Sequence, residues 1–315
     1  MGAFVNGTWR EGDFPHDTSG HFVRPDSPFR NWITASGEAG PSGAGGFKAE
    51  PGRYHLIISL ACPWAHRTLI FRRLKGLDSM ISLSVVHWLL GERGWTFDAG
   101  PGVIPDPIFG ASELREFYAK ARPDYSGRVT VPVLWDKTKN TIVNNESSEI
   151  IRMFNSAFDG VGAAAGDYYP TGLQPEIDEI NDRIYRTVNN GVYRAGFATS
   201  QEAYEEAFAQ LFETLDWLEA RLAGQRFLMG QRLTEADWRL FTTLIRFDAV
   251  YFGHFKCNLR EIRNYPALSR YLRELYHLPG IAETVDFFHI KHHYYESHRR
   301  INPTGIVPVG PELEL

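Results

Sequence analysis

The pattern of apolar residues changes in the middle of this 315-residue chain. Before residue 159, runs typical of β-strands and of helices follow one another in the order βαβ and then ββα. After residue 172, apolar residues recur at spacings of three and four, which is typical of helices, and no β-rich run intervenes. The glycine- and alanine-rich stretch 159–166 between them has the composition of a linker. We therefore predict an α/β domain followed by an all-α domain.

This pattern divides the chain into five expected parts. Residues 1–50 are rich in Gly, Pro, Ser and Thr and show neither helical nor strand periodicity, so we interpret them as an N-terminal arm that wraps the folded body. The α/β domain spans 51–158 and the all-α domain 173–298, joined by a linker at 159–172. Residues 299–315 form a C-terminal tail.

Composition excludes several classes of protein. The 33 Lys and Arg residues against 38 Asp and Glu give a formal charge of −5, so the chain lacks the basic field of a nucleic-acid binder. No apolar run approaches the roughly 18 residues of a membrane span, so we expect no membrane partner. The N-terminus shows no recognisable targeting signal, and two cysteines far apart suit a reducing compartment. We therefore expect a cytoplasmic protein.

Cys62 stands where a predicted strand at 54–60 gives way to a helix. A thiol at a helix N-terminus faces unpaired amides and the positive end of the helix dipole, which lowers its pKa and favours the nucleophilic thiolate. His66 and Arg67 add positive potential nearby. The residue three positions on is Ala65 and not a second cysteine, so only a mixed disulfide that an outside thiol resolves is available. We predict that Cys62 is a nucleophile, with an inert buried thiol as the alternative.

Two further segments of the α/β half suit a peptide-like ligand. Val131 precedes Pro132, and the order of elements predicts a cis bond there that leaves the Val131 backbone able to pair with an extended peptide. Glu146 and Ser147 open the next predicted helix, where the hydroxyl and an amide suit a carboxylate and Glu146 suits an ammonium group. Helix capping alone is the alternative for this pair.

A histidine cluster near the C-terminus raises the question of a metal. Four of the eleven histidines lie between His289 and His298. No carboxylate-rich motif accompanies them, so we predict a mildly basic helix and no metal site.

Together these residues resemble the glutathione-transferase superfamily, and within it the xi class, the glutathionyl-hydroquinone reductases. The resemblance covers about residues 3–310. It is carried by the motifs Cys62–Arg67, Gly94–Phe97, Asn144–Ser148, Asn189–Tyr193, Arg246–Tyr251, His289–His298 and Ile301–Thr304. It implies a thioredoxin-like N-terminal domain, an all-α C-terminal domain and a homodimer. It also implies glutathione as co-substrate and no metal.

The same resemblance implies a reaction and its residues. Cys62 would attack the sulfur of an S-glutathionyl-hydroquinone, and a second glutathione would resolve the mixed disulfide to give glutathione disulfide. Five residues would contact glutathione, with the first two at its glycyl side and thiol edge: Trp95, Arg128, Val131, Glu146 and Ser147. Three tyrosines would contact the ring: Tyr193, Tyr251 and Tyr294. We expect Tyr193 and Tyr294 to donate hydrogen bonds to the ring oxygen that accepts charge as the carbon–sulfur bond breaks.

Two other functions stay open at this point. A general deglutathionylase or dehydroascorbate reductase of omega type would share the cysteine but lack the insert that carries Trp95 and the three tyrosines. A non-catalytic ligand carrier with the same fold would not need Cys62, because carriage requires no nucleophile at a helix start.

Overall fold

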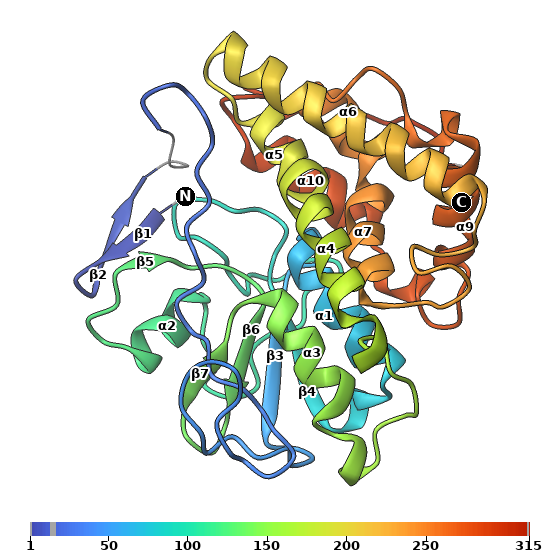
Figure 1. The fold of residues 1–315 in the computed structure, drawn as a ribbon. Coiled ribbons are helices and arrows are strands. Elements are labelled where there is room, and N and C mark those ends of the chain that lie inside the picture. The colour runs from blue at the N-terminus through green and yellow to red at the C-terminus, as the bar shows by residue number, and fades with distance from the viewer. Residues whose placement is uncertain (1, 13–16, 314) are drawn as a thin grey trace. The chain divides into compact units, whose positions relative to one another are not determined.

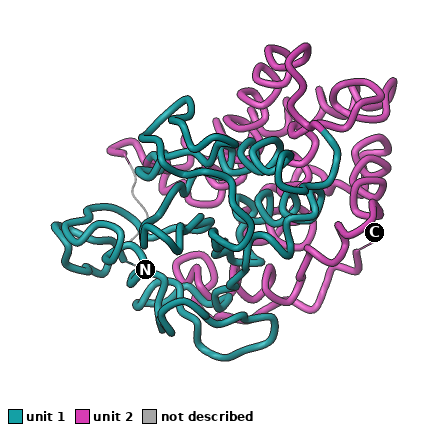
Figure 2. The backbone as a smooth tube through the Cα atoms, turned by 90° about the horizontal axis from the view of Figure 1, so that it is seen from below, with its two compact units in different colours: residues 1–13, 26–166 teal, residues 14–25, 167–315 magenta. Residues whose placement is uncertain are grey.

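The computed structural model describes residues 2–12, 17–313 and 315 and divides into two compact units (Figure 2). Unit 1 contains residues 1–13 and 26–166, and unit 2 contains residues 14–25 and 167–315. Residues of the N-terminal arm therefore belong to both units.

Unit 1 is built around a four-stranded sheet with the order β4-β3-β6-β7 (Figure 1). Its strands are β3 (Tyr54–Ile58), β4 (Ile81–Val85), β6 (Val133–Asp136) and β7 (Thr141–Asn144). Strand β3 runs parallel to β4 and antiparallel to β6, so that Leu56 pairs with Leu83 on one side and with Leu134 on the other. All five residues of β3 are buried, which explains its uninterrupted apolar run.

The helices of unit 1 complete the expected topology. Helices α1 (Pro63–Leu74) and α3 (Ser147–Ser156) pack against each other, and α2 (Arg115–Ala121) contacts β7. Short 3₁₀ turns follow α1 and α3, at η1 (Leu77–Ser79) and η2 (Asp159–Val161). The βαβ and ββα order that the sequence predicts is confirmed.

A second, three-stranded sheet was not expected. It contains β1 (Gly2–Val5), β2 (Thr8–Glu11) and β5 (Gly127–Arg128) in the order β2-β1-β5. Asn6 and Gly7 join β1 to β2 with φ of 49° and 74°, the backbone that a two-residue hairpin turn requires. The expectation that residues 1–50 lack regular structure is therefore wrong at this hairpin, because strands of four residues are too short to show periodicity.

Unit 2 is helical, as predicted. Its α-helices are α4 (Gln174–Ile184), α5 (Gly191–Gly196), α6 (Gln201–Ala223), α7 (Glu235–Arg246), α8 (Phe252–His254), α9 (Pro266–Tyr276) and α10 (Phe287–Ser297). The apolar periodicity predicts continuous helices here, but two π-helical segments interrupt them: η4 (Tyr185–Asn189) and η5 (Phe247–Tyr251). Single 3₁₀ turns are η3 (Thr171–Leu173), η6 (Ile262–Asn264) and η7 (Ala282–Thr284).

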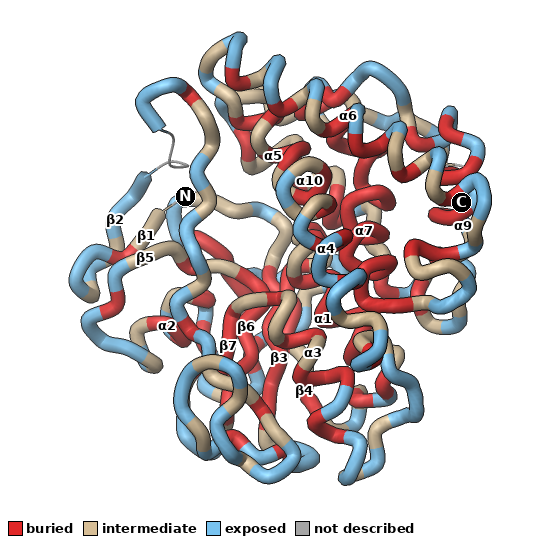
Figure 3. The backbone as a smooth tube through the Cα atoms, in the orientation of Figure 1, coloured by how far each residue is buried: buried red, intermediate tan, exposed pale blue. Residues whose placement is uncertain are grey.

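The core of unit 2 surrounds α7, all of whose residues are buried (Figure 3). Helix α6 buries one stripe along its length: Ala203, Ala207, Leu211, Leu215, Leu218 and Leu222. The spacing of three and four puts these residues on one face of the helix. This spacing is the apolar periodicity from which the sequence predicts a helix here. Among the described residues, no helix is both long enough and apolar enough to cross a membrane.

Candidate active site

Cys62 is the N-cap residue of α1. Its backbone is extended, with φ −77° and ψ 120°, and Pro63 occupies the start of the helix. The sulfur is half-buried and lies 3.7 Å from the carbonyl oxygen of Val131. The peptide bond between Val131 and Pro132 is cis, as expected. The thiol thus lies at a helix end whose first amides lack partners within the helix, beside a loop backbone that suits an extended ligand.

A buried tyrosine outside the sequence motifs fixes the loop that carries Val131. The Tyr118 hydroxyl of α2 donates to the Thr130 carbonyl at 2.8 Å and accepts from the Thr130 amide at 3.2 Å. It also accepts from the Asn145 side chain at 3.1 Å. Tyr118 therefore ties the loop before Val131 to the loop before α3. No pattern in the sequence indicates this role.

A buried cation lies on the same helix as the thiol. The Arg67 guanidinium of α1 lies 4.6 Å from the ring centroid of Trp64, and both Arg67 and His66 are buried. Because Trp64 and Arg67 are three residues apart, they share one face of the helix. Arg67 is the fifth residue of α1, and a cation beside a thiol at a helix start favours the thiolate form.

Glu146 and Ser147 lie together at the start of α3. The Glu146 carboxylate accepts hydrogen bonds from the Ser148 amide at 3.0 Å and from the Ser27 hydroxyl at 3.2 Å, so it caps the helix as the simpler alternative predicts. The Ser147 hydroxyl is buried and makes no hydrogen bond to any described residue. Buried hydroxyls nearly always have a partner, so this one suits an acceptor that a ligand brings, such as a carboxylate.

Trp95 and Arg128 lie on segments apart from these. Trp95 is buried in the insert, where its carbonyl accepts the Leu114 amide at 2.9 Å. Arg128 is half-buried in β5, paired with Ala3 of the N-terminal hairpin. The structure thus brings Cys62 to Val131 and Glu146 to Ser147, and it holds Trp95 and Arg128 on two other segments of unit 1.

The three tyrosines named from the sequence form one cluster within unit 2. The hydroxyl oxygens of Tyr193 and Tyr294 lie 2.5 Å apart, and those of Tyr251 and Tyr294 lie 2.9 Å apart. Their side chains come from α5, the end of η5 and α10. Phe255 packs against all three rings, with centroid distances of 5.5, 5.5 and 5.6 Å. We call these three tyrosines the tyrosine cluster.

Burial sets the hydrogen-bonding capacity of the tyrosine cluster. Tyr251 and Tyr294 are at most 1% exposed, and desolvation raises the pKa of both phenols well above the usual range. The hydroxyls of Tyr251 and Tyr294 therefore stay protonated near neutral pH. Each protonated hydroxyl can both donate and accept a hydrogen bond, so the cluster is a connected set of donors and acceptors. Tyr193, at 8% exposed, is the most accessible of the three.

The two π-helical segments place two of these tyrosines. Segment η5 ends at Tyr251, and η4 ends four residues before Tyr193. A π-helical turn inserts a residue into a helix and rotates everything after it, which is why such turns often mark functional sites. The motifs at 189–193 and 246–251 therefore coincide with changes of helix register.

Two histidines, His298 just after α10 and His254 at the end of α8, pack among aromatic rings. His298 Nδ1 lies 3.1 Å from His254 Nε2, and His298 stacks at 5.8 Å on Phe255. Burial lowers the pKa of His254 to about 4 and that of His298 well below the usual range, so both are neutral. Over residues 2–12, 17–313 and 315, no group of three or more His, Cys, Asp or Glu residues is arranged to hold a metal ion.

Comparison with known proteins identifies the family. The model for the glutathione S-transferase N-terminal domain matches residues 61–157, and that for the C-terminal domain matches residues 201–274. The xi-class glutathione transferase of Natrialba magadii superposes with a TM-score of 0.91 at 49% identity, covering 100% of this chain and 94% of that one. This chain belongs to the xi class of glutathione transferases.

Relatives of this xi-class transferase include enzymes with a named activity. It is 59% identical to the glutathionyl-hydroquinone reductase YqjG of Escherichia coli, over 100% of this chain and 97% of the relative. It is 58% identical to the glutathionyl-hydroquinone reductase PcpF of Sphingobium chlorophenolicum, over 100% and 98%. The glutathione-bound structure of the E. coli protein superposes with a TM-score of 0.90 at 61% identity, covering 91% and 94%.

Proposed function

We propose that this xi-class transferase is a glutathionyl-hydroquinone reductase, which converts S-glutathionyl-hydroquinones to hydroquinones at the expense of glutathione. Its full-length identity of 59% and 58% to two enzymes of that name supports the proposal. The observation that carries the chemistry is a lone thiol at the start of α1, 3.7 Å from the Val131 carbonyl.

In the first step, the Cys62 thiolate attacks the sulfur that joins glutathione to the ring. The carbon–sulfur bond breaks, and its electron pair passes into the ring. A carbanion is a poor leaving group, so the ring reacts as its keto tautomer, in which an oxygen accepts the charge. The ring carbon keeps the proton that formed the keto tautomer. The ring leaves as a phenolate, which takes up the proton that the second glutathione thiol loses and so becomes hydroquinone, while Cys62 holds glutathione as a mixed disulfide.

In the second step, the thiolate of another glutathione attacks the mixed disulfide. The products are glutathione disulfide and the Cys62 thiolate, which is ready for the next turn. One conjugate and one glutathione give one hydroquinone and one glutathione disulfide, so one thiol and the thioether sulfur are joined in a disulfide for each ring reduced. Ala65 leaves no second cysteine in this helix turn to compete as the resolving thiol.

Glutathione is a γ-glutamyl peptide, and the residues of unit 1 suit its parts. The Val131 backbone pairs with the cysteinyl unit, as the proximity of Cys62 to its carbonyl supports. The partnerless Ser147 hydroxyl accommodates the γ-glutamyl carboxylate, and Glu146 accommodates the ammonium group. Trp95 and Arg128 complete the site at the glycyl side and the thiol edge. Glutathione bound to the E. coli relative supports glutathione as the ligand of this chain.

The tyrosine cluster supplies the donor that the first step requires. A neutral phenol that donates to the ring oxygen stabilises the charge developing there, as an oxyanion hole does. Tyr193 and Tyr294 fill this role, and Tyr251 contacts the ring and orients the Tyr294 hydroxyl 2.9 Å away. We further propose that the enzyme is a cytoplasmic homodimer, which light scattering and cell fractionation test directly.

A second candidate is a general omega-type deglutathionylase or dehydroascorbate reductase. A relative named omega-like transferase in Schizosaccharomyces pombe is 51% identical, over 93% of this chain and 94% of the relative. The tyrosine cluster favours the reductase, because disulfide exchange with a glutathionylated protein needs no donor for a ring oxygen. Cys62 at its helix start disfavours a carrier without turnover.

The test is glutathione-dependent release of hydroquinone from a synthetic S-glutathionyl-hydroquinone. We expect rapid release by the native protein, none by Cys62→Ala, and native release by the control Cys257→Ala, which removes a fully buried thiol whose pKa burial raises. No release by the native protein, with a glutathione adduct still forming at Cys62, would point to the deglutathionylase. Neither release nor adduct would point to the carrier.

A further inference from the structure

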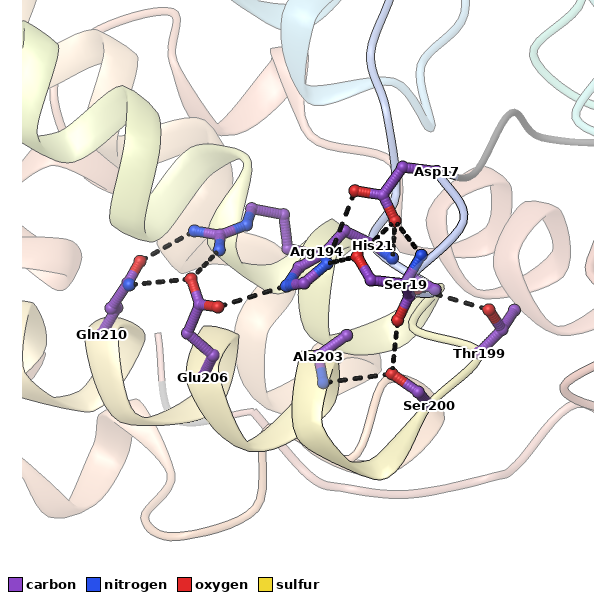
Figure 4. Close-up of polar contacts among 10 residues, drawn as sticks. Asp17, Ser19, His21, Arg194, Thr199, Ser200, Ala203, Glu206 and Gln210 are labelled. Carbon is purple, nitrogen blue, oxygen red and sulfur yellow. Dashed lines mark hydrogen bonds and ion pairs between the residues drawn. The ribbon is translucent and has the colours of Figure 1, made fainter.

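A segment of the N-terminal arm, residues 17–24, docks on the helices of unit 2, and we call it the strap (Figure 4). Its backbone joins the turn between α5 and α6. The Thr199 amide donates to the Gly20 carbonyl at 3.0 Å, and the Ser200 hydroxyl donates to the Ser19 carbonyl at 2.8 Å. Ser200 also caps α6, so the strap contacts the start of the longest helix described.

Polar side chains hold the strap at its other face. The Asp17 carboxylate accepts the amides of Ser19 and His21 at 3.0 and 2.9 Å, which folds the strap into a tight turn. His21 Nε2 then lies 3.2 Å from the Glu206 carboxylate of α6, as Figure 4 shows. Arg194 of α5 donates to the same carboxylate at 2.8 Å. The strap is therefore fixed to α6, through a carboxylate that Arg194 also ties to α5.

The close approach of the strap requires a glycine. Gly20 has φ of +90°, in the region that residues with side chains rarely adopt. A Cβ atom there would lie 2.9 Å from the Thr199 hydroxyl and 3.0 Å from the Ser200 amide. Both neighbours already contact the strap, so neither can move away without loss of these contacts.

The strap delivers Arg24 to the tyrosine cluster. Arg24 Nε donates to the Asn190 side chain at 2.8 Å, and the guanidinium carbon lies 5.0 Å from the ring centroid of Tyr193. Asn190 and Tyr193 are three residues apart and share one face of the chain entering α5. Phe22, 5.4 Å from the guanidinium, packs at 5.4 Å on Phe197. The motif at 189–193, singled out in the sequence, therefore holds an arginine against the most exposed phenol of the cluster.

We propose that Arg24 is a positioning residue of the reductase that strengthens Tyr193 as a hydrogen-bond donor to the leaving ring. A cation over a phenol ring is attracted to its π-electrons, and the attraction grows as the phenol oxygen gains negative charge. Donation to a ring oxygen that becomes an oxyanion transfers such charge to Tyr193. Arg24 thus acts through Tyr193 during carbon–sulfur cleavage. This inference rests on the proposed reductase function.

Substitution of Arg24 tests the proposal, because its effect on kcat should depend on the substituents of the leaving ring. The assay measures kcat and KM with S-glutathionyl-hydroquinones whose rings carry either electron-withdrawing or electron-donating groups. We expect Arg24→Gln to lower kcat about three- to thirtyfold, the range that a cation–π contact spans. The loss is larger for electron-donating rings, which accept charge poorly, and KM for glutathione is unchanged. Arg24→Lys keeps the charge and recovers part of the loss. The matched control is Arg186→Gln, which removes an exposed arginine that pairs with Asp182 in the same unit.

A second variant distinguishes the role of Arg24 in turnover from a general loss of folding stability. Gly20→Ala lifts the strap but leaves the arginine intact, and we expect the same ring dependence as for Arg24→Gln. Gly224→Ala is its control, because nothing lies within 4 Å of a Cβ there. The role of Arg24 is overturned if Arg24→Gln has the kcat of the native enzyme. It is also overturned if kcat falls by the same factor with every ring. A ring dependence in Gly20→Ala that Arg24→Gln lacks overturns it as well. Native protein without turnover overturns the reductase function, and the role of Arg24 with it.

Discussion

Replacing Tyr294 by phenylalanine tests whether the tyrosine cluster behaves as one hydrogen-bonded unit. The Tyr294 hydroxyl contacts both other phenols, at 2.5 and 2.9 Å, so its loss removes two hydrogen bonds of about 1 kcal/mol each. It also leaves the fully buried Tyr251 hydroxyl with one hydrogen-bond partner fewer, at a further cost of about 1–2 kcal/mol. The expected loss in the free energy of unfolding is about 3–4 kcal/mol.

Two companion variants test whether the losses at Tyr294 and Tyr251 are coupled. Tyr251→Phe removes one contact and leaves Tyr294 paired with Tyr193, so we expect a loss of about 1 kcal/mol. The double variant has no buried hydroxyl at position 251 to lose a partner and should lose about 2 kcal/mol, roughly 2–3 kcal/mol less than the sum of the single losses.

Urea unfolding followed by circular dichroism at a helical wavelength measures these differences, because most of the helix lies in unit 2. Tyr276→Phe is the matched control, since it changes a half-buried phenol of α9 outside the cluster. Single losses that add within about 0.5 kcal/mol in the double variant would show that the three hydroxyls are energetically independent. Hydrogen-bond coupling within the tyrosine cluster would then be refuted.

Three further predictions concern the same chain. Tyr193→Phe and Tyr294→Phe should each lower kcat of hydroquinone release about 10²- to 10³-fold, as loss of an oxyanion donor does, and unchanged turnover in both would remove the tyrosines from the mechanism. Ser147→Ala should weaken glutathione binding, measured by calorimetry, about tenfold or more. It should leave the urea midpoint unchanged, because the hydroxyl has no described protein partner. A lowered midpoint with native affinity would instead indicate that the hydroxyl has a structural role. Burial lowers the pKa of His55 to about 4, so the stability that its neutral form provides is complete above about pH 6.5 and is lost, by roughly 3 kcal/mol, as pH falls toward 4. His55→Gln should therefore flatten the fall in urea midpoint between pH 7.5 and 4.5, and an unchanged slope would assign the acid sensitivity to other groups.

The fold could be read from the sequence because its main elements produce regular patterns. The buried run of β3 and the apolar stripe of α6 follow directly from periodicity. The π-helical segments η4 and η5 could not be found in this way, because one inserted residue leaves the apolar spacing of neighbouring turns almost unchanged. The hairpin at Asn6 and Gly7 carried a recognisable turn signal, but its strands were too short to support it.

The candidate site divides in the same way. Cys62 and Val131 could be proposed from local motifs, and the structure places them 3.7 Å apart. Tyr118 and Arg24 were missed because their roles depend on partners far along the chain. Asn190, for example, is 166 residues from Arg24. A residue whose role depends on non-local partners gives no pattern in a single sequence, even when it positions residues that do lie in recognisable motifs.

The division of the arm between the two units has a consequence for engineering. The chain passes from unit 1 to unit 2 near residue 13, returns near residue 25 and passes over again at residue 166. Unit 2 is therefore not a contiguous cassette. A chimera that exchanges only residues 167–315 between transferases would combine the helices of one parent with the strap and Arg24 of the other. To exchange a working helical half, residues 17–25 must be exchanged together with residues 167–315.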